Sequence, residues 1–331
     1  MTVDRIASGV LTEGQIIREP DGHRKGCWIG APAFFYDRAD RVFYLSYRLR
    51  RPRGVKPDRG AEVRIARSSD GVQFEDIVTI KKDTLATTSI ERCPLYRGPD
   101  GQWRFFLAYV DPADKRWCIS VLKAPSVEQL NPKQARRIFS GQEMNLEGIK
   151  DPWIFEHDGL FYMIVSVALA TADTSGQSHA TFDIYNTGQC LSATGLAASS
   201  DLEQWQWRGV VFEPSSSGWD CYCRRIDSVV AFGGRFFGFY DGLAGYRDNY
   251  EEKTGLAVSS NMKDWRCLTP DGPVLTSPHG SGALRYVDAQ IIGEQAYLYY
   301  ELARPDEAHD LRAVITDAKV LTDFLVKNDR A

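Results

Sequence analysis

The stretch KDPWIFEHDGLFYMIVS, from Lys150 to Ser166, has the pattern of a β-hairpin. Two apolar runs flank Asp158-Gly159, a dipeptide that favours a tight turn between antiparallel strands. Asp151 and Pro152 stand at the start of the first run, immediately before its most hydrophobic part. This position requires an explanation, because a buried strand rarely begins with a charged residue.

The same hairpin pattern occurs five times along the chain. Each copy has β-branched or aromatic runs separated by a turn that contains Gly or Asp, which is strand chemistry. The other copies are GAPAFFYDRADRVFYLSYR, RCPLYRGPDGQWRFFLAYV, IDSVVAFGGRFFGFYDG and VDAQIIGEQAYLYYELA. Alignment of the copies by their strand starts gives five corresponding positions, which are Ala31, Cys93, Asp151, Asp227 and Asp288.

A second pattern follows three of the hairpins. It consists of a short apolar strand, a Ser-Ser-Asp or Ser-Ser-Asn turn, an aromatic residue and another strand. Its copies are VRIARSSDGVQFEDI, GLAASSDLEQWQWRGV and GLAVSSNMKDWRCLT, and WCISVLKAPSVEQLNP is a weaker one. Four strands repeated about every 60 residues predict an all-β fold, namely a five-bladed β-propeller whose four-stranded blades surround a central channel.

We expect a single domain over residues 1–331. The blades are predicted at approximately 25–85, 86–142, 143–214, 215–276 and 277–320. The fifth blade lacks a complete second hairpin, and HDLRAVITDAKVL supplies only one further strand. We expect the N-terminal segment RIASGVLTEGQIIRE to close the ring with another, because an unpaired edge strand is a liability.

The strand starts predict a cluster of carboxylates. The first strand of each propeller blade lines the channel, so the five starts form a ring at one channel mouth. This ring contains Asp151, Asp227 and Asp288, and Glu91 lies two residues before Cys93 as a fourth candidate. Carboxylates that lie close together raise one another's pKa, which provides an acid and a base at one pH. The alternative is that each Asp only caps a turn.

Two of these motifs resemble those of known enzymes. The hairpin KDPWIFEHDGLFYM and the AxSxDLxxW type of repeat resemble glycoside hydrolase family 43 and its relatives in families 32, 68, 117 and 130, which are five-bladed propellers. As architecture, the resemblance covers almost the whole chain and implies a glycoside hydrolase. In family 43, a base aspartate opens blade 1, a pKa-tuning aspartate opens blade 3 and an acid glutamate opens blade 4. By this pattern Asp151 matches the blade 3 residue, Asp227 stands at the acid position, and Ala31 replaces the base.

The missing carboxylate at Ala31 requires a different catalytic set. We expect Asp227 to act as general acid, Asp288 or Glu91 as base or nucleophile, and Asp151 as a positioning group that sets the pKa. Two carboxyl groups about 5–5.5 Å apart would give retention of configuration, and about 6.5–9.5 Å would give inversion. Both stereochemical outcomes remain open at this point.

Arginines accompany the carboxylates. Arg92, Arg225 and Arg285 lie close to ring positions, and the loop RLRRPRGVKPDRG, which begins at Arg48, is strongly basic. Arg binds carboxylate or phosphate through two parallel hydrogen bonds, so we expect an anionic sugar as substrate. The alternatives are a solvated loop, or arginines that neutralise the acidic ring.

Four other residues are candidates for substrate binding. Trp28 and Tyr286 lie near strand starts, where aromatic rings can stack on sugars. Arg247 belongs to the long loop GLAGYRDNYEEKTG, which is expected to shape the pocket. The resemblance to family 43 also implies a histidine in the channel near blade 5, and His279 is the candidate.

The composition argues against several other classes of protein. A net charge of −4 gives no reason to expect nucleic acid or membrane binding, and no apolar run reaches the ~18 residues of a membrane span. The N-terminus shows no secretion signal, so we expect a cytoplasmic protein whose seven cysteines are reduced. We expect no metal and no other cofactor; the expected partner is a small carbohydrate, and the oligomeric state stays open.

Two other functions are compatible with the sequence. On the same fold, the acidic ring and the arginines would serve a phosphorylase, transglycosidase, lyase or cyclase, and phosphate-dependent turnover would identify a phosphorylase. The missing acid at Ala31 also fits a non-catalytic carbohydrate-binding propeller, which would bind glycans without turnover.

Overall fold

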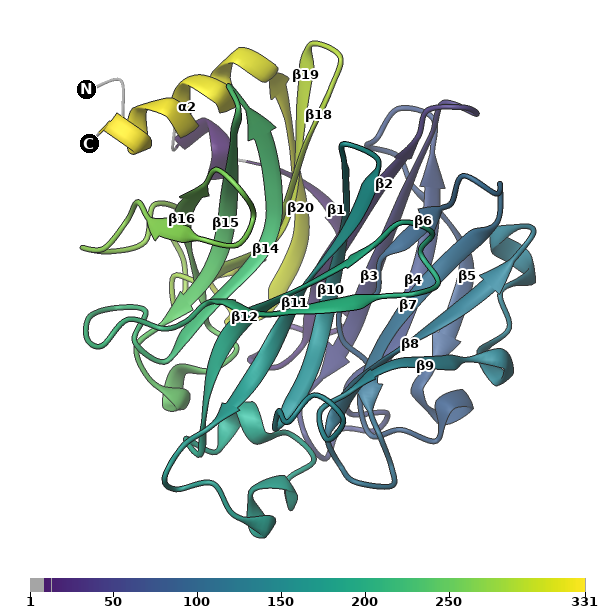
Figure 1. Cartoon of the computed structure of the whole chain (residues 1–331), viewed down its shortest axis with the longest axis vertical. Helices are drawn as coiled ribbons and strands as arrows, with labels where there is room; N and C mark the ends of the chain where they lie inside the picture. Colours follow the sequence, from purple (N-terminus) through teal and green to yellow (C-terminus); the bar gives the residue numbers. More distant parts are fainter. Residues whose placement is uncertain (1–8, 13, 331) are drawn as a thin grey trace.

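Antiparallel strands follow one another along almost the whole chain, which ends in helix α2 (Ala318–Arg330) (Figure 1). The computed structural model describes residues 9–12 and 14–330. The all-β class predicted from the hairpin repeats is confirmed. Within the described ranges, no helix has the length and apolarity needed to cross a membrane.

The strands pair in two eight-stranded sheets and one four-stranded sheet. For description we divide them into five units of four strands, called units 1 to 5 here. Unit 1 contains β2 (Trp28–Asp37), β3 (Val42–Arg51), β4 (Arg59–Ser68) and β5 (Glu75–Lys81). Unit 2 contains β6 (Leu95–Arg97), β7 (Trp103–Val110), β8 (Trp117–Ala124) and β9 (Arg136–Ser140). Unit 3 contains β10 (Gly148–His157), β11 (Leu160–Ala170), β12 (Cys190–Ser199) and β13 (Gln206–Phe212). Unit 4 contains β14 (Cys223–Phe232), β15 (Arg235–Leu243), β16 (Lys253–Ser259) and β17 (Trp265–Cys267). Unit 5 contains β18 (Leu284–Ile292), β19 (Gln295–Ala303), β20 (His309–Asp317) and the N-terminal strand β1 (Gln15–Arg18).

The N-terminal strand joins the last unit. β1 runs antiparallel to β20, with Gln15 opposite Ala313 and Ile16 opposite Arg312. Residues 5–8 and 13 of the segment predicted to add this strand lie outside the described residues. A parallel pair between Trp28 and His309 also joins β2 of unit 1 to β20 of unit 5. Both ends of the chain therefore contribute to the region where units 5 and 1 meet.

Buried apolar side chains fill the spaces between neighbouring units. Separate clusters lie between units 1 and 2, 2 and 3, 3 and 4, 4 and 5, and 5 and 1. Each four-stranded sheet thus buries both faces, as the apolar character of the strands requires. Helix α2 adds Leu321, Phe324 and Leu325 to the cluster between units 4 and 5.

The second sequence repeat is explained by its turns. In each complete copy, one side-chain oxygen accepts two backbone hydrogen bonds: Asp70 from Val72 and Gln73, Asp201 from Glu203 and Gln204, and Asn261 from Lys263 and Asp264. Such turns occur with Asp and Asn because their short side chains reach the backbone two residues ahead. The repeat therefore encodes the connection between the third and fourth strands of units 1, 3 and 4.

We expect the apolar face of β1 to stabilise the junction between units 5 and 1. Ile17 is 8% exposed and packs in the cluster there, whereas the adjacent Ile16 is 47% exposed. Ile17→Ala should lower the free energy of unfolding by about 2 kcal/mol, because a buried side chain is truncated. Ile16→Ala is the matched control and should cost less than about 0.5 kcal/mol. Urea unfolding curves measure both, and equal losses would mean that β1 does not pack as described.

Candidate active site

A backbone irregularity near the start of the first strands in units 1, 3 and 5 shapes the site. Strand pairing slips between Gly30 and Ala33, between Lys150 and Trp153, and between Arg285 and Asp288. Within each slip one residue adopts a left-handed conformation, with φ of 49° at Ala31, 51° at Asp151 and 55° at Tyr286. Non-glycine residues rarely adopt this conformation, and such residues concentrate at functional sites.

This register corrects one alignment made from the sequence. Tyr286, not Asp288, is the residue of unit 5 that corresponds to Asp151 and Ala31. Asp288 corresponds to Trp153, two residues further into the strand. The predicted equivalence of Asp288 with Asp151 is therefore wrong, because the irregular residues shift the count.

Asp288 lies at the centre of the molecule with its carboxylate fully engaged. One oxygen accepts hydrogen bonds from the Phe34 amide at 2.7 Å and pairs with Arg92 at 3.2 Å. The other accepts a hydrogen bond from the Trp153 indole at 3.1 Å. Its side chain has no solvent exposure, and burial raises its pKa although Arg92 opposes this. Asp288 thus ties units 1, 2, 3 and 5 together.

Arg92 links the predicted carboxylates to one another. Its guanidinium donates to the backbone oxygens of Pro32 at 2.6 Å and Asp227 at 2.5 Å, and it pairs with Asp288. Its backbone N–H donates to Asp151 Oδ1 at 3.3 Å. The structure therefore brings Asp151, Asp227 and Asp288 around a single buried arginine from unit 2.

Asp227 and Asp241 form a pair of buried carboxyl groups. Oδ2 of each lies out of solvent and accepts no hydrogen bond from a protein donor, and the two side chains are within hydrogen-bonding reach of each other. Burial together with Asp241 raises the pKa of Asp227 well above its ordinary value. Burial together with Glu252 raises the pKa of Asp241 to about 7. Like charges this close cannot both ionise, so the pair holds a proton at neutral pH.

The pair ends a chain of alternating charges that crosses units 2, 1, 5 and 4. Each member is at most 3% exposed and forms an ion pair with the next, in the order Glu91, Arg48, Glu301, Arg285, Glu252, Arg225 and Asp241. Glu301 has no solvent exposure. Burial opposes its ionisation, but Arg285, Arg48 and a hydrogen bond with His309 hold its pKa well below the usual range.

The arginines of the basic loop do not form a free cationic patch. Arg48 pairs with Glu91 at 2.8 Å and with Glu301 at 3.1 Å, and Arg50 pairs with Glu91 at 3.3 Å. Arg59 lies 3.6 Å from Asp183. These contacts match the alternative in which arginines neutralise the acidic ring. Arg225 and Arg285 are likewise occupied by Glu252 and Glu301.

Asp151 differs from the other carboxylates in its partner. Its Oδ2 lies 3.0 Å from Nζ of Lys150, the preceding residue. That ammonium also lies over the rings of Trp117 and Tyr185, at 5.2 and 4.9 Å from their centroids. A lysine held over two aromatic faces is fixed in place, and it keeps a positive charge beside the Asp151 carboxylate.

The structure places the predicted binding residues in two groups. Trp28 and Tyr286 are 3% exposed and belong to the site, where the guanidinium of Arg285 lies 5.1 Å from each ring centroid. His279 and Arg247 lie on exposed loops, and the structure gives neither side chain a contact with the carboxylates. Both assignments therefore stay predictions.

His309, which was not predicted from the sequence, is buried where units 5 and 1 meet. It has no solvent exposure and stacks on Trp28 with 4.7 Å between ring centroids. Its Nδ1 lies 2.8 Å from Glu301, and its Nε2 lies 3.2 Å from Glu251. The imidazole therefore joins the chain of ions to Glu251 on the adjoining loop.

Two loops cover the site formed by the buried carboxylates and arginines. Asp183, from the long connection between β11 and β12, accepts hydrogen bonds from the Trp117 indole at 3.1 Å and from the Tyr250 hydroxyl. Tyr250 comes from the loop before β16, and the Arg50 guanidinium lies 4.2 Å from its ring centroid. Burial opposes ionisation of Asp183, but Arg59 and Lys150 lower its pKa. Asp183 therefore anchors the long connection between β11 and β12 through these hydrogen bonds.

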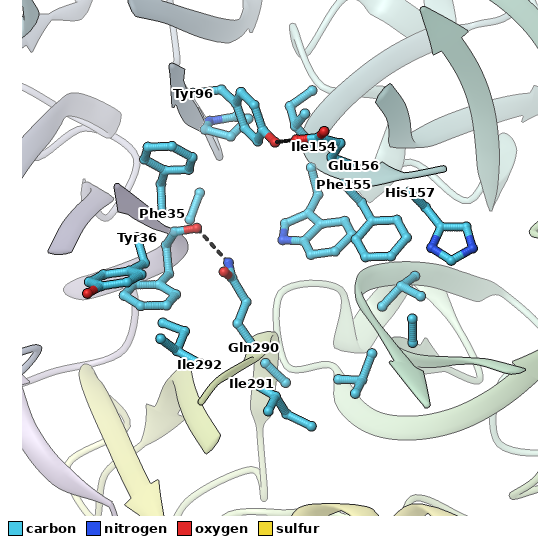
Figure 2. A pocket seen from close by; sticks show the side chains of 18 of the residues that line it. Phe35, Tyr36, Tyr96, Ile154, Phe155, Glu156, His157, Gln290, Ile291 and Ile292 are labelled. Atoms are coloured by element: carbon cyan, nitrogen blue, oxygen red, sulfur yellow. Dashed lines mark hydrogen bonds between the residues drawn. The ribbon is translucent and has the colours of Figure 1, made fainter. Parts of the chain in front are cut away.

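A cavity lies at the other end of the first strands. It measures about 430 Å³ and is lined by the far halves of β2, β10, β14 and β18. Figure 2 shows Phe35 and Tyr36 on one side and Phe155 and His157 on the other, with Gln290 pointing between them. Gln290 donates to the Phe34 carbonyl at 2.7 Å. Asp288 and Trp153 separate this aromatic cavity from the carboxylates.

Within the described part of the chain, no group of three or more His, Cys, Asp or Glu side chains is arranged to hold a metal ion.

Comparisons with known proteins give matches to solved structures. No family model and no curated protein matches this sequence. An endo-arabinase from Bacteroides thetaiotaomicron matches with a TM-score of 0.60 and 13% identity, over 92% of this chain and 97% of that one. A β-1,2-mannobiose phosphorylase from Listeria innocua matches with a TM-score of 0.61 and 12% identity, over 94% and 95%. A thermostable family-43 glycoside hydrolase matches with a TM-score of 0.61 and 14% identity, over 87% and 89%.

This chain has the fold of the propeller glycoside hydrolases. The resemblance inferred from the hairpin and the repeat is thereby confirmed as a likeness of fold. At these identities the comparisons place no catalytic residue, so the roles of individual side chains depend on the geometry given above.

Several residues of the site were missed in the sequence. Arg48, Asp241 and Glu301 lie on the second strands of units 1, 4 and 5. Arg48 and Glu301 pair with Gly30 and Arg285, the last residues before the register shift in their units. Asp241 pairs with Arg225, close to the register shift in unit 4. Only an approximate signal existed for Asp241 and Glu301: a regular count back from each turn pairs them with Ile226 and Tyr286, one residue from their true partners, because the register slips. His309 had no such signal, because its position follows from the parallel contact between units 5 and 1.

We expect the chain of ions to depend on Glu301. Glu301→Gln removes the charge shared by Arg48, Arg285 and His309, and leaves buried cations without compensation. The free energy of unfolding should fall by about 3 kcal/mol or more. The matched control is Glu294→Gln on the exposed turn after β18, with an expected change below about 0.5 kcal/mol. Denaturant unfolding compares the two, and a loss as small as that of the control would contradict the described network.

Proposed function

We propose that this protein cleaves glycosidic bonds and that Asp227 is its general acid. The observation that carries the proposal is the buried pair of Asp227 and Asp241, because an acid must hold its proton at working pH. A raised carboxyl pKa beside a charge partner is the usual preparation of such an acid. The fold shared with hydrolases and a phosphorylase supports a sugar as the substrate class.

We infer that the five strand units are the five blades of a closed propeller. The pairing of β1 with β20 supports β1 as the outer strand of the last blade. The apolar cluster between units 5 and 1 supports closure of the ring. In this arrangement the starts of β10, β14 and β18 face one mouth of the channel, which would be the catalytic face.

Hydrolysis also needs a group that activates water or attacks the sugar. Glu91 and Asp151 are the candidates, since each carries a carboxylate next to the ring formed around Arg92. We assign Asp288 a positioning role instead of the base role. Its oxygens are already used by Phe34, Trp153 and Arg92, so it has no lone pair directed at a substrate.

Phosphorolysis is the second candidate, because of Ala31. Phosphate is already an anion and needs no base to attack a sugar, so a site with an acid and no base opposite it suits this reaction. The buried Nη1 of Arg48 makes no hydrogen bond to the protein, and such a donor suits an anionic oxygen. A hydrolase works without phosphate, whereas a phosphorylase requires it.

Asp227→Asn should reduce cleavage of alkyl glycosides and disaccharides by about 100- to 10,000-fold, because the leaving oxygen is no longer protonated. Dinitrophenyl glycosides should lose much less activity, because that leaving group departs as an anion without a proton. The measurement is sugar release from a broad glycoside panel, with and without inorganic phosphate. Near-normal activity on disaccharides would remove Asp227 from the acid role.

The control for this substitution is Asp271→Asn, which changes an exposed carboxylate away from the site. It should leave all rates unchanged. The far-ultraviolet circular dichroism of Asp227→Asn should match that of the unsubstituted protein, because Asn still offers Asp241 a hydrogen bond.

Asp241→Asn should move the alkaline limb of the kcat/KM profile to lower pH. In the unsubstituted protein, the proton on the pair is lost as pH rises through the raised pKa values, and activity falls with it. Removal of the neighbouring negative charge lowers the pKa of Asp227, so the proton is lost earlier. Profiles of kcat/KM against pH measure this shift. A limb that stays in place, as expected for Asp271→Asn, would contradict the coupling.

A further inference from the structure

A second cleft opens beside the chain of ions, on unit 4 and the start of unit 5. It measures about 400 Å³. Its walls are Lys25, Trp219, Gly242, Leu243, Ala244, Asp248, Glu251, Lys253, Pro273 and Ser281. The lining combines one large aromatic ring with several side chains that donate or accept hydrogen bonds. Such a lining suits a ligand whose ring carries several hydroxyl groups.

Trp219 is a fixed platform in this cleft. Its indole N–H donates to the Thr269 carbonyl at 2.8 Å. Its ring stacks on Tyr240 with 5.6 Å between centroids and an interplanar angle of 27°. A Cβ at Gly242 would overlap with the indole, so the ring lies directly on the backbone at that glycine. These contacts set the plane of the ring before any ligand arrives.

The polar groups of the cleft differ in how far they are already occupied. Glu251 accepts a hydrogen bond from the Ser281 hydroxyl and lies 3.4 Å from Nζ of Lys25, which is 60% exposed. Lys253, at the start of β16, has no side-chain hydrogen bond or ion pair with any residue that the structure describes. Asp248 is exposed on the loop opposite. An ammonium and a carboxylate are thus both available to sugar hydroxyls.

Glu251 connects the cleft with the site. Its Oε2 lies 3.2 Å from Nε2 of His309, whose other nitrogen contacts Glu301 in the chain of ions. One wall of the cleft is therefore also a boundary of the carboxylate site. A ligand that enters both places would be longer than one sugar.

We propose that this cleft binds a second sugar unit, so that the substrate of the site is at least a disaccharide. The inference rests on the proposed function. The second ring stacks on Trp219, its hydroxyls bond to Lys253 and Asp248, and the bond to be cleaved lies toward Asp227. The recognised chemistry is a hydroxyl-bearing ring with one apolar face, which pairs with an aromatic platform.

The test compares substrates of different length. With the glycoside that the enzyme cleaves, Trp219→Ala should raise KM for the disaccharide and trisaccharide about 10-fold or more. KM for the aryl monosaccharide should change less than about 2-fold, because that substrate does not reach the cleft. Lys253→Gln should give the same pattern with a smaller rise, and Trp219→Phe should recover most of the affinity. An equal rise in KM for all lengths would overturn the proposal.

A blocking variant covers the possibility that Trp219→Ala unfolds. Ala244→Trp adds a large ring at an exposed position within the cleft and removes no contact of the core. It should also raise KM only for the longer substrates. The matched control is Thr79→Trp on the exposed side of β5, away from the cleft, and it should change nothing. Unchanged KM for the longer substrates in Ala244→Trp would overturn the proposal.

Binding without turnover separates this inference from the proposed function. Unsubstituted protein and the Ala244→Trp variant are applied to an array of immobilised mono-, di- and trisaccharides. Selective loss of di- and trisaccharide binding in the variant, in a protein that cleaves no glycoside, would reject the catalytic function and keep the cleft. Cleavage that is insensitive to chain length and to the cleft variants would keep the catalytic function and reject the cleft as a second sugar site.

Discussion

The carboxylates and guanidinium groups at the centre of the molecule are buried, so each needs a partner of opposite charge. This requirement determines how the central side chains are arranged. Removal of a carboxylate or guanidinium from water costs several kcal/mol, which only opposite charges and hydrogen bonds offset. From Glu91 to Arg225 the signs alternate without a break. The alternation fails only at Asp241 and Asp227, where two acids follow each other. In the proposed function, a proton takes the place of the missing cation, and the same rule that stabilises the network supplies the acid.

The sequence was sufficient for the fold class because periodicity carries that information. Hairpins broken by Asp-Gly turns and a recurrent Ser-Ser-Asp turn predicted the all-β fold and its likeness to propeller glycosidases, and both are confirmed. Periodicity also placed Asp151 and Asp227 at strand starts. It failed at Asp288, because two irregular residues, Tyr286 and Val287, change the count without any change in hydrophobic pattern. Contacts between units, such as that of His309 with Trp28, leave no local signal at all.

The arginines illustrate a different limit of sequence reasoning. RLRRPRG predicts a positive surface when its charges are counted along the chain. In three dimensions, β3 alternates its side chains, and Arg48 and Arg50 point to the interior, where Glu91 and Glu301 meet them. Their charges are neutralised by ion pairs with the protein's own carboxylates. We therefore propose that recognition of the substrate falls to less occupied groups, such as Lys253 and the Trp219 ring in the cleft.

The absence of an acid at position 31 follows from the same electrostatics. The Ala31 amide donates to Glu301 at 3.1 Å, so a carboxylate from β19 already lies beside the position where family 43 has its base. Glu301 itself is held by Arg48, Arg285 and His309 and has little capacity to accept a proton. An aspartate at position 31 would bring a second negative charge against it. In the proposed function, this network disfavours a base from unit 1, so the attacking group is activated at Glu91 or Asp151 or arrives as an anion.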